Sequence, residues 1–558
     1  MKRFVMRGLA PLLALCVYGT ASADAGWLPT AAKAIKIQPG TATSPLAAGT
    51  PMQITVSLKL NNAQQLQAFL RDVNTPGSPA YGHYLTPSQF AALYSPTSAQ
   101  AQSVASYLSA SGLSNVQIAA NRQLIRADGT AASVQRTFHT TLTQFTQGGK
   151  SRYVNTTDAQ VPLTLGNSVL GVMGLNNLEL RHTGVGVPDP NAPFGLSPQA
   201  LQRAYDAGNT PTGSATTIAI FAFGDMGGVL ADLSHFEGEY GLPSVPVSVV
   251  QVGSGPWTDD SGRTEWDMDT QTSIGIAGGV QQLVLYNGGN AGTDMPAAFN
   301  QFVIDDVARA GSVSISGCEL AEELLSGGIV ETEDQIFQQG AAQGQTIFAS
   351  SGDTGATCYD FVAGIVIGGA ANGVPDGGIP LGQAYPASSP WVIAAGGTTL
   401  TVTSAGDYNI ETAWDAGGGG ISLLESAPSW QSPVLPASAV TSIIGFRGVP
   451  DIAMDADFLL SPAAIVVDGA DSSNGGTSLS SPLSLGVWAR LQSAHGNALG
   501  FAGPALYMLT QGGAVTSTVT GFHDIIVGNN GLYSATPGWD YTTGLGSFDI
   551  SAVNALLH

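Results

Sequence analysis

The chain has 558 residues, too many for one ordinary domain and enough for an accessory domain followed by a large catalytic unit. Residues 24–189 carry 10 Lys and Arg against 6 Asp and Glu, a net charge of +4, whereas residues 190–558 carry 5 against 34, a net charge of −29. So acidic a second part argues against nucleic acid as a partner, because phosphate binding needs a basic face. It fits a protein that works in acid or, more simply, a soluble secreted protein.

The first residues have the pattern of a secretory signal. Three basic residues precede an apolar run over residues 9–18, and Ala21-Ser22-Ala23 supplies the small residues of a cleavage site. The run is shorter than the roughly 20 residues that a bilayer requires, which disfavours the alternative of an uncleaved membrane anchor. We therefore expect residues 1–23 to be a signal peptide and the protein to be secreted, extracellular or periplasmic, without a membrane segment.

Two cysteines, Cys318 and Cys358, remain after this segment. In an oxidising compartment they are able to form one disulfide, and two buried thiols are the alternative. Neither lies in a CxxC or histidine pattern, so a zinc site has little support.

Residues from about 50 to 180 alternate short strand-like and helix-like segments, which predicts a compact α+β domain of open-sandwich type. The expected strands are Met52–Leu58 and Val116–Ala119, and the expected helices are Asn62–Val73, Pro87–Leu93 and Ala99–Ala110. Residues 183–194 follow, rich in Gly, Pro and Asn, and they predict an exposed linker where proteases cut easily.

Beyond the linker, apolar runs bounded by glycine alternate with helical patterns. Continuous Val, Ile and Ala runs predict strands buried on both faces, hence a parallel sheet covered by helices, with the chemistry at the carboxyl ends of the strands. The expected strands are Thr217–Phe223, Gln282–Tyr286, Ser312–Ser316, Thr346–Ser350 and Trp391–Ala395, and the expected helices include Pro296–Ala310 and Glu331–Ala342.

Ser478 is the candidate nucleophile. It follows two glycines and a threonine and precedes a helical pattern over Leu483–Ser493, so we expect it to be exposed at the positive end of a helix dipole. A serine in this position is equally able to be an ordinary N-cap.

A serine nucleophile needs a base, and the four histidines beyond the linker are poor candidates. His235, His495, His523 and the terminal His558 all lack the sequence setting of a subtilisin-type base.

Carboxylates offer another route to a base. Glu265 and Asp269 are four residues apart, which on a helix places them on one face, where they share a proton and titrate as a pair. From ordinary pKa values such a pair accepts a seryl proton at roughly pH 3 to 5. A solvated helix face is the alternative, and Asp267 between them is expected to be such a solvated residue.

Asp353 follows a predicted buried strand directly. At that position its carboxyl group, when protonated, is able to donate a hydrogen bond to the oxyanion of a tetrahedral intermediate. An aspartate before Thr-Gly is also an ordinary turn residue.

Together these segments resemble the sedolisin (serine-carboxyl) peptidase family over nearly the whole chain. The similar segments are 81–87 in the N-terminal part, and 385–390, 396–398, 414–420 and 447–451 in the second part. The resemblance implies that Glu265 is the base, that Asp269 orients it, that Ser478 attacks, and that Asp353 completes the oxyanion hole. It also implies an inhibitory activation prodomain, peptide and protein substrates, and an acyl-enzyme.

The same resemblance implies a calcium site near the C-terminus. Its ligands are the carboxylates of Asp524 and Asp540 and the backbone carbonyls of Ile525, Thr536 and Gly538, an all-oxygen set that suits a hard cation. Thr536 stands where the family often has glycine, and the segment between the two aspartates is shorter than usual. Two ordinary aspartate turns are the alternative.

The expected fold class is α/β, a subtilisin-like catalytic domain with a central parallel sheet, preceded by an α+β open-sandwich prodomain. The expected domains are the signal peptide 1–23, the prodomain 24–182, the linker or processing region 183–195 and the catalytic domain 196–558. We expect a monomeric acid endopeptidase made as a proenzyme. The alternatives are a tripeptidyl-peptidase, a non-catalytic secreted binding protein and a neutral protease that uses a histidine.

Overall fold

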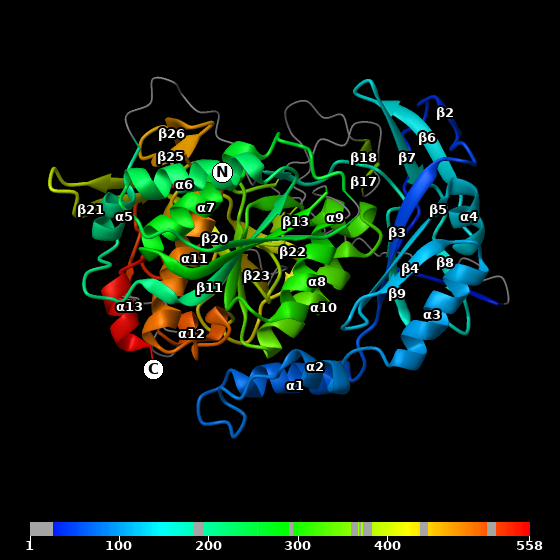
Figure 1. The fold of residues 1–558 in the computed structure, drawn as a ribbon, viewed down its shortest axis with the longest axis horizontal. Coiled ribbons are helices and arrows are strands. Elements are labelled where there is room, and N and C mark those ends of the chain that lie inside the picture. Colours follow the sequence, from blue (N-terminus) through cyan, green and yellow to red (C-terminus); the bar gives the residue numbers. More distant parts are fainter. Residues whose placement is uncertain are drawn as a thin grey trace, which may run out of the picture.

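The computed structural model consists of two units packed side by side, a smaller one from the N-terminal third and a larger one from the rest (Figure 1). The expected signal peptide, residues 1–23, and residues 184–194 of the expected linker lie outside the residues that it describes. The described residues are 26–183, 195–253, 255–289, 294–358, 366–367, 370–371, 382–435, 445–509 and 521–557.

An eight-stranded sheet forms the middle of the larger unit, in the order β12-β13-β11-β14-β16-β20-β21, with β24 also paired to β20. Every pairing is parallel except that of β20 with β21. The predicted parallel sheet is therefore confirmed, and most residues of its inner strands are buried, as their continuous apolar runs require. The strands are β11 Gly213–Phe223, β12 Val247–Gln251, β13 Val280–Gly288, β14 Ala310–Val313, β16 Thr346–Ser350, β20 Ile393–Val402, β21 Tyr408–Ala413 and β24 Ile452–Asp455.

One predicted strand is two strands in the structure. The segment expected as Ser312–Ser316 divides into β14, which stays in the main sheet, and β15 Ile315–Cys318, which joins β10 and β19 in a separate three-stranded sheet. Ser314 lies at the break, and its hydroxyl donates a hydrogen bond to a carboxyl group of the neighbouring helix.

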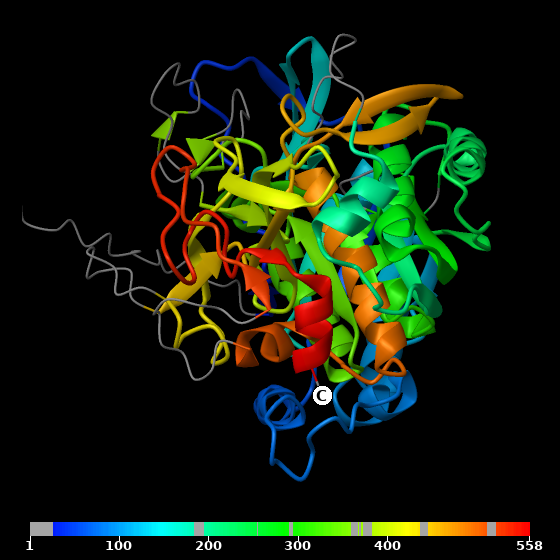
Figure 2. The ribbon, with the colours of Figure 1, turned by 90° about the vertical axis from the view of Figure 1, so that its left-hand side faces the viewer.

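Two helices of the larger unit differ from their predicted bounds. Helix α8 is Met295–Asp305 and ends earlier than expected, because Asp306 adopts a left-handed conformation with φ of 50°. Helix α11 is Thr477–Ala494 and begins six residues earlier than expected, so that Ser478 lies in its first turn. It packs on α7 Arg263–Ala277 and against β11, β14, β16, β20 and β24. Figure 2 shows the C-terminal helix α13 in red beside the orange α11.

The smaller unit contains the predicted open sandwich. Its antiparallel sheet has the order β4-β5-β3-β9 and is covered by α3 and α4, around a core separate from that of the larger unit. The elements are β3 Pro51–Leu58, α3 Ser98–Ala110, β4 Ser114–Ile118, β5 Leu124–Thr130, α4 Ala131–Thr137 and β9 Val169–Met173.

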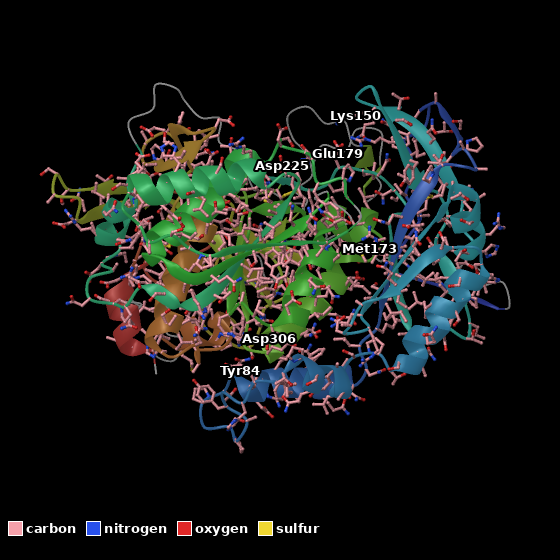
Figure 3. All side chains as sticks on the ribbon, viewed as in Figure 1. Tyr84, Lys150, Met173, Glu179, Asp225 and Asp306 are labelled. Carbon is pink, nitrogen blue, oxygen red and sulfur yellow. A yellow bond between two sulfur atoms is a disulfide. The ribbon has the colours of Figure 1, made fainter. Side chains whose placement is uncertain are left out.

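Helices α1 Ala63–Val73 and α2 Pro87–Leu93 extend from this sandwich beneath the larger unit (Figure 1). Near them, the Tyr84 side chain packs so closely on two glycines that a Cβ atom would lie 2.8 Å from its ring at Gly344 and 1.7 Å from its hydroxyl oxygen at Gly500. Figure 3 shows Tyr84 at this lower edge and Met173 facing the larger unit from β9. The two units therefore share a wide, packed interface, in which α10 Ile329–Ala342 contacts α1, α2 and β9.

The remaining elements are short or lie at the periphery, and no helix in the described ranges is both long and apolar enough to span a bilayer. They are β1 Trp27–Pro29, β2 Thr43–Pro45, β6 Leu142–Gln147, β7 Lys150–Asn155, β8 Gln160–Pro162, β10 His182–Thr183, α5 Pro198–Ala204, α6 Gly227–Glu239, α9 Glu319–Leu325, β17 Val366–Ile367, β18 Ala370–Ala371, β19 Ala384–Tyr385, β22 Gly420–Ser426, β23 Phe446–Val449, β25 Ala463–Val467, β26 Ala470–Asn474, α12 Ala502–Met508, β27 Phe522–His523, β28 Ser547–Phe548 and α13 Ile550–Leu556.

Candidate active site

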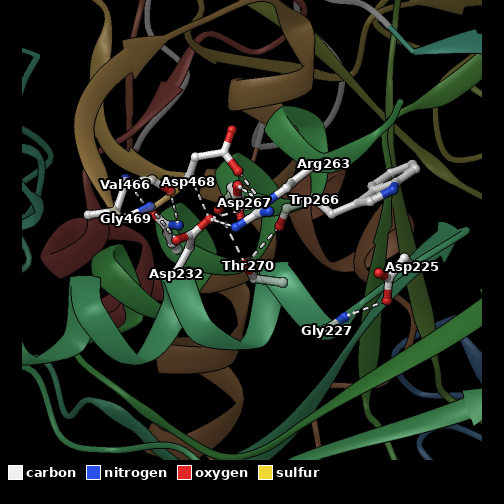
Figure 4. A network of polar contacts seen from close by, with 11 residues as sticks. Asp225, Gly227, Asp232, Arg263, Trp266, Asp267, Thr270, Val466, Asp468 and Gly469 are labelled. Atoms are coloured by element: carbon white, nitrogen blue, oxygen red, sulfur yellow. Dashed lines mark hydrogen bonds and ion pairs between the residues drawn. The ribbon is translucent and has the colours of Figure 1, made fainter. Parts of the chain in front are cut away.

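Helix α7 is fixed in place at its amino-terminal end by Arg263. The guanidinium binds Asp232 of α6, with Nη2 at 2.7 Å from Oδ2, and Asp468 of the β25–β26 turn, with Nη1 at 2.7 Å from Oδ1. Figure 4 shows these carboxylates converging on Arg263. Asp232 also accepts hydrogen bonds from the backbone N–H groups of Asp468 and Gly469. The helix is thereby joined to α6 and to the β25–β26 hairpin.

Asp267 does not occupy the solvated face expected for it, and that prediction is wrong. Its side chain is fully buried beside Arg263, with Oδ2 3.7 Å from Nε, and neither carboxyl oxygen accepts a hydrogen bond within the described residues. Burial, reinforced by the charge of Asp232, raises the pKa of Asp267 to about 8. The reason for the difference is that α7 is enclosed on all sides, so that every residue from Glu265 to Ala277 is buried.

Glu265 and Asp269 lie one turn apart on α7, as predicted, and both are buried. Burial raises the pKa of each carboxyl group well above its ordinary value, and the charge of Asp269 raises that of Glu265 further. The pair therefore retains protons to a higher pH than isolated carboxyl groups do, and it titrates as a unit.

Ser478 is the second residue after Gly476, the N-cap of α11, so the N-cap alternative does not describe it. It is fully buried rather than exposed as expected, because Ser314 and the α7 carboxyl groups surround it. Pro482, four residues later, has no N–H with which to bind the Ser478 carbonyl. The Ser314 hydroxyl lies 3.4 Å from that carbonyl instead.

The Ser478 hydroxyl and the Glu265 carboxyl group face each other without a formed hydrogen bond. Neither the hydroxyl oxygen nor either carboxyl oxygen has a hydrogen-bond partner among the described residues. The hydroxyl is nevertheless close enough to lower the pKa of Glu265 against the larger effect of burial. Catalytic contacts are often long before substrate binds.

Asp353 lies on the loop after β16, beside the start of α11. Its Oδ1 accepts hydrogen bonds of 2.8 Å from both the backbone N–H and the hydroxyl of Thr477, the residue before Ser478. Burial raises the pKa of Asp353, and the Thr477 contacts lower it by less. Its charge also raises the pKa of Glu265. The loop is linked to β15 by a disulfide between Cys318 and Cys358, whose Cα atoms are 5.5 Å apart, so the disulfide is confirmed in the structure.

Ser314 is a site residue that the sequence did not reveal. Its hydroxyl donates a hydrogen bond of 2.8 Å to Oδ1 of Asp269. The signal was a serine directly after a buried strand, at the edge where the carboxyl ends of parallel strands meet. It was hidden because the expected strand continued through it.

The histidines within the described residues have other contacts. His235 is exposed on α6, His495 Nε2 lies 3.2 Å from the Asn554 side chain, and the His523 ring stacks on Tyr408 at 3.8 Å. His558 lies outside the described residues. Since the Ser478 hydroxyl has no hydrogen-bond partner in the described part of the chain, none of the three contacts it.

The expected calcium ligands lie on one loop. The backbone N–H of Gly538 donates to both Asp524 oxygens at 3.2 and 3.1 Å, and that of Thr536 donates to Oδ2 of Asp540 at 2.7 Å. Both carboxylates therefore face the same turn.

The donor set of this loop suits a hard cation. In the described residues no hydrogen bond to the carbonyl oxygens of Ile525, Thr536 or Gly538 is present, and neither aspartate forms an ion pair. Asp540 is buried, and hydrogen bonds rather than an ion pair offset its charge: Oδ1 accepts from the backbone N–H and the hydroxyl of both Thr542 and Thr543. Within the described ranges no three or more His, Cys, Asp and Glu side chains are placed so that they could hold a metal ion together, so carbonyl oxygens would have to complete the coordination.

Comparison with known proteins defines the class of this site. The family described as "Pro-kumamolisin, activation domain" matches residues 40–178. The chain is 39% identical to sedolisin of Pseudomonas sp. (strain 101), over 98% of this chain and 95% of that protein. It is 38% identical to xanthomonalisin of Xanthomonas sp. (strain T-22), over 92% of this chain and 66% of that protein.

A solved structure agrees with these sequences. Pseudomonas sedolisin, described as a serine-carboxyl proteinase complexed with two molecules of pseudo-iodotyrostatin, aligns with a TM-score of 0.58 and 40% identity over 66% of this chain and 98% of that one. Fold, site and similarity together define a serine-carboxyl peptidase with a proenzyme activation domain. The chain belongs to the sedolisin family.

Proposed function

We propose that this peptidase is a secreted, acid-acting endopeptidase in which Ser478 is activated by the Glu265–Asp269 pair. The observation that carries the proposal is the position of the Ser478 hydroxyl, buried against two adjacent carboxyl groups and without a histidine contact in the described residues. The greater similarity to sedolisin and xanthomonalisin than to tripeptidyl-peptidases, which are 24–25% identical, supports the endopeptidase assignment.

The reaction proceeds through an acyl-enzyme. Glu265, ionised while Asp269 holds the shared proton, takes the Ser478 hydroxyl proton as Oγ forms a bond to the peptide carbonyl carbon. Protonated Asp353 donates a hydrogen bond to the oxyanion, its Oδ1 being held by Thr477. Glu265 then returns the proton to the leaving amine as the C–N bond breaks. Water then attacks the ester carbonyl carbon while Glu265 takes its proton, and Glu265 returns that proton to Ser478 Oγ as the C–O bond breaks and the acid product leaves.

Acid action follows from the protonation states that this mechanism needs. Asp353 must be neutral and the pair must carry one proton, which sets an upper pH limit; burial raises the pKa of all three carboxyl groups and so places that limit above the range of ordinary carboxyl groups. At high pH both pair members ionise and Asp353 loses its proton, so the oxyanion donor is lost.

The N-terminal unit is proposed as the inhibitor of the proenzyme. It carries a net charge of +4 against the acidic second part, and Arg181 forms buried ion pairs with Glu322 and Glu333 across the interface. Acid neutralises carboxylates and loosens this contact. Cleavage then follows in the region 183–200. The disulfide supports secretion into an oxidising compartment, and we propose that the mature enzyme is monomeric.

One structural calcium ion is proposed at the C-terminal loop. Asp524 and Asp540 would hold it with the carbonyl oxygens of Ile525, Thr536 and Gly538. When bound, the ion supplies positive charge that compensates the buried Asp540 carboxylate and fixes the loop.

The test is hydrolysis of a denatured protein at about pH 4 by the full chain, compared with Ser478→Ala and Glu265→Gln. Wild type should process itself and release internal fragments, whereas both variants should stay near full length. Activity in Ser478→Ala would overturn the mechanism, and tripeptides as the main product would replace the endopeptidase assignment. A wild-type chain inactive at every pH would indicate a binding protein on this fold, and an optimum above about pH 7 would indicate a histidine base.

A further inference from the structure

Strand β10, the last described segment of the N-terminal unit, lies along a strand of the larger unit. It pairs antiparallel with β15, His182 opposite Ser316 and Thr183 opposite Ile315. The chain therefore runs towards Ser314, which contacts both Asp269 and the Ser478 carbonyl. A substrate peptide in this register would run from its amino-terminal residues towards the nucleophile. Its residues before the scissile bond would therefore lie along β15.

The other edge of β15 is occupied by β19, with Gly317 opposite Tyr385. Departure of the N-terminal unit leaves the β10 side of β15 as an open strand edge. Such an edge binds an extended peptide through main-chain hydrogen bonds, and side-chain pockets provide the specificity.

Gly317 permits the close approach of the peptide backbone. A Cβ atom at this position would lie 2.6 Å from the carbonyl oxygen of Leu180 and 2.5 Å from Oε1 of Glu322. A side chain here would therefore separate the peptide from β15, and it would displace the carboxylate that binds the next residue, Arg181.

Arg181 shows what kind of side chain this edge accepts. Its Nε donates to Glu322 Oε1, and its Nη1 and Nη2 donate to the two oxygens of Glu333, all at 2.9 Å. The guanidinium also lies 5.9 Å from the centre of the Tyr385 ring. Arg181 and both glutamates are almost completely buried. Both carboxylates and the aromatic ring belong to the larger unit, whereas the guanidinium comes from the unit that is removed.

We propose that β15, Glu322, Glu333 and Tyr385 form a substrate subsite on the mature enzyme that binds an arginine side chain several residues before the scissile bond. This inference rests on the proposed function. The planar, two-pronged contact with Glu333 favours arginine over lysine, because an ammonium group does not match both carboxylate oxygens at once. The pocket that Arg181 fills in the proenzyme is thereby reused for peptide recognition.

The test uses the full chain after self-processing in acid, assayed at the highest pH at which it remains active, because burial raises the pKa of Glu333 to about 7 and its carboxyl group ionises only towards that pH. One peptide has a fixed cleavage sequence, and arginine is moved through the positions before the scissile bond. At each position arginine is compared with citrulline, which has nearly the same shape without the charge, and with lysine. At one position kcat/KM for the arginine peptide should exceed that for the citrulline peptide by about tenfold, and lysine should lie between them.

Glu333→Gln should reduce this ratio to about one, whereas the matched variant Glu331→Gln, on the same helix but without a contact to Arg181, should retain it. If Glu333→Gln fails to fold, the wild-type peptide series alone decides. Hydrolysis of every peptide at similar rates would overturn the subsite and leave the proposed function intact. No hydrolysis of any peptide would overturn the proposed function itself.

Discussion

The hydroxyl of Ser314 donates a hydrogen bond of 2.8 Å to Asp269 and lies 3.4 Å from the carbonyl oxygen of Ser478. A serine hydroxyl has one proton to donate. When Asp269 is ionised, the Ser314 hydroxyl donates its proton in a hydrogen bond to the carboxylate. When Asp269 is protonated, its own O–H is able to donate to Ser314, which frees the Ser314 proton for the Ser478 carbonyl that Pro482 leaves unbound. Ser314 thus connects the protonation of α7 to the start of α11.

Ser314→Ala should lower kcat and move the acid limb of the pH profile to higher pH. The hydroxyl lowers the pKa of Asp269, so its removal raises that pKa and keeps both carboxyl groups protonated further up the pH scale. Because Asp269 holds the shared proton in the mechanism, the lost hydrogen bond is an uncharged one, which costs about 0.5–1.5 kcal/mol, or roughly 2- to 10-fold in rate. Steady-state kinetics between about pH 3 and pH 7 measures both effects.

Ser312→Ala is the matched control for this prediction. Ser312 is buried on β14, two residues before Ser314, and its hydroxyl lies 2.7 Å from that of Ser481 rather than bonding to the carboxyl pair. It should lose stability without a shift in the pH profile. An equal shift in both variants would mean that Ser314 acts only through packing.

Asp267→Asn should make stability less dependent on pH. The folded chain keeps the Asp267 proton up to about pH 8, whereas the unfolded chain releases it near 3.8, so the folded state binds more protons in between. Stability from this group is therefore present below about pH 4 and lost as pH rises to about 8. Thermal unfolding of the full chain carrying Ser478→Ala, with and without Asp267→Asn, measures the difference.

Asp232→Asn should change the pH dependence of stability in the opposite direction and serves as the comparison. Burial opposes the shift, but the Arg263 contact and the N–H groups of Gly469 and Asp468 hold the pKa of Asp232 below its ordinary value. This variant should be destabilised at neutral pH, and its deficit should shrink as pH falls below about 4. The Asp267 assignment fails if both variants change the pH dependence in the same direction.

Calcium should raise the midpoint of thermal unfolding, and a chelator should lower it. Ligand at one hundred times its Kd stabilises a folded protein by about 2.7 kcal/mol, which corresponds to several degrees. Asp540→Asn should abolish the response. Asp549→Ala removes the N-cap of α13, where Asp549 accepts from the N–H of Ala552 at 2.9 Å, so it should lower the midpoint but keep the response. A calcium response in Asp540→Asn would refute the proposed site.

Arg181→Met should let the proenzyme process itself faster and at higher pH than wild type. Glu322 and Glu333 would lose their buried cation, and an unpaired buried charge costs about 3–5 kcal/mol. Gel analysis of processing against time and pH measures the change. Arg152→Met, which breaks an ion pair with Glu179 within the N-terminal unit, should process as wild type does. Unchanged processing of Arg181→Met would show that this contact does not hold the inhibitor.

Local pattern was sufficient to predict the parallel sheet and the pairing of Glu265 with Asp269. Continuous apolar runs predict buried strands, and the helical repeat alone places residues four apart on one face. Asp353 was found for a similar reason, because it follows the buried strand β16 directly.

Contacts between segments distant in sequence were not predictable in this way. Asp267 is buried because α6 and the β25–β26 turn close over α7, and nothing within α7 indicates this. The pairing of Arg181 with Glu333 joins residues 152 positions apart. The sequence predicts an exposed Ser478 because a helix start by itself does not reveal the loops that pack around it.

Because β10 pairs antiparallel with β15, cleavage of the chain is not sufficient for activity. Because β10 precedes the linker, cutting the chain after residue 183 leaves His182 and Thr183 paired with Ser316 and Ile315 of β15. The cleaved enzyme would therefore stay inactive until the N-terminal fragment dissociates. Dilution favours dissociation of the fragment and would shorten the lag before activity appears. At high protein concentration the lag would be longer.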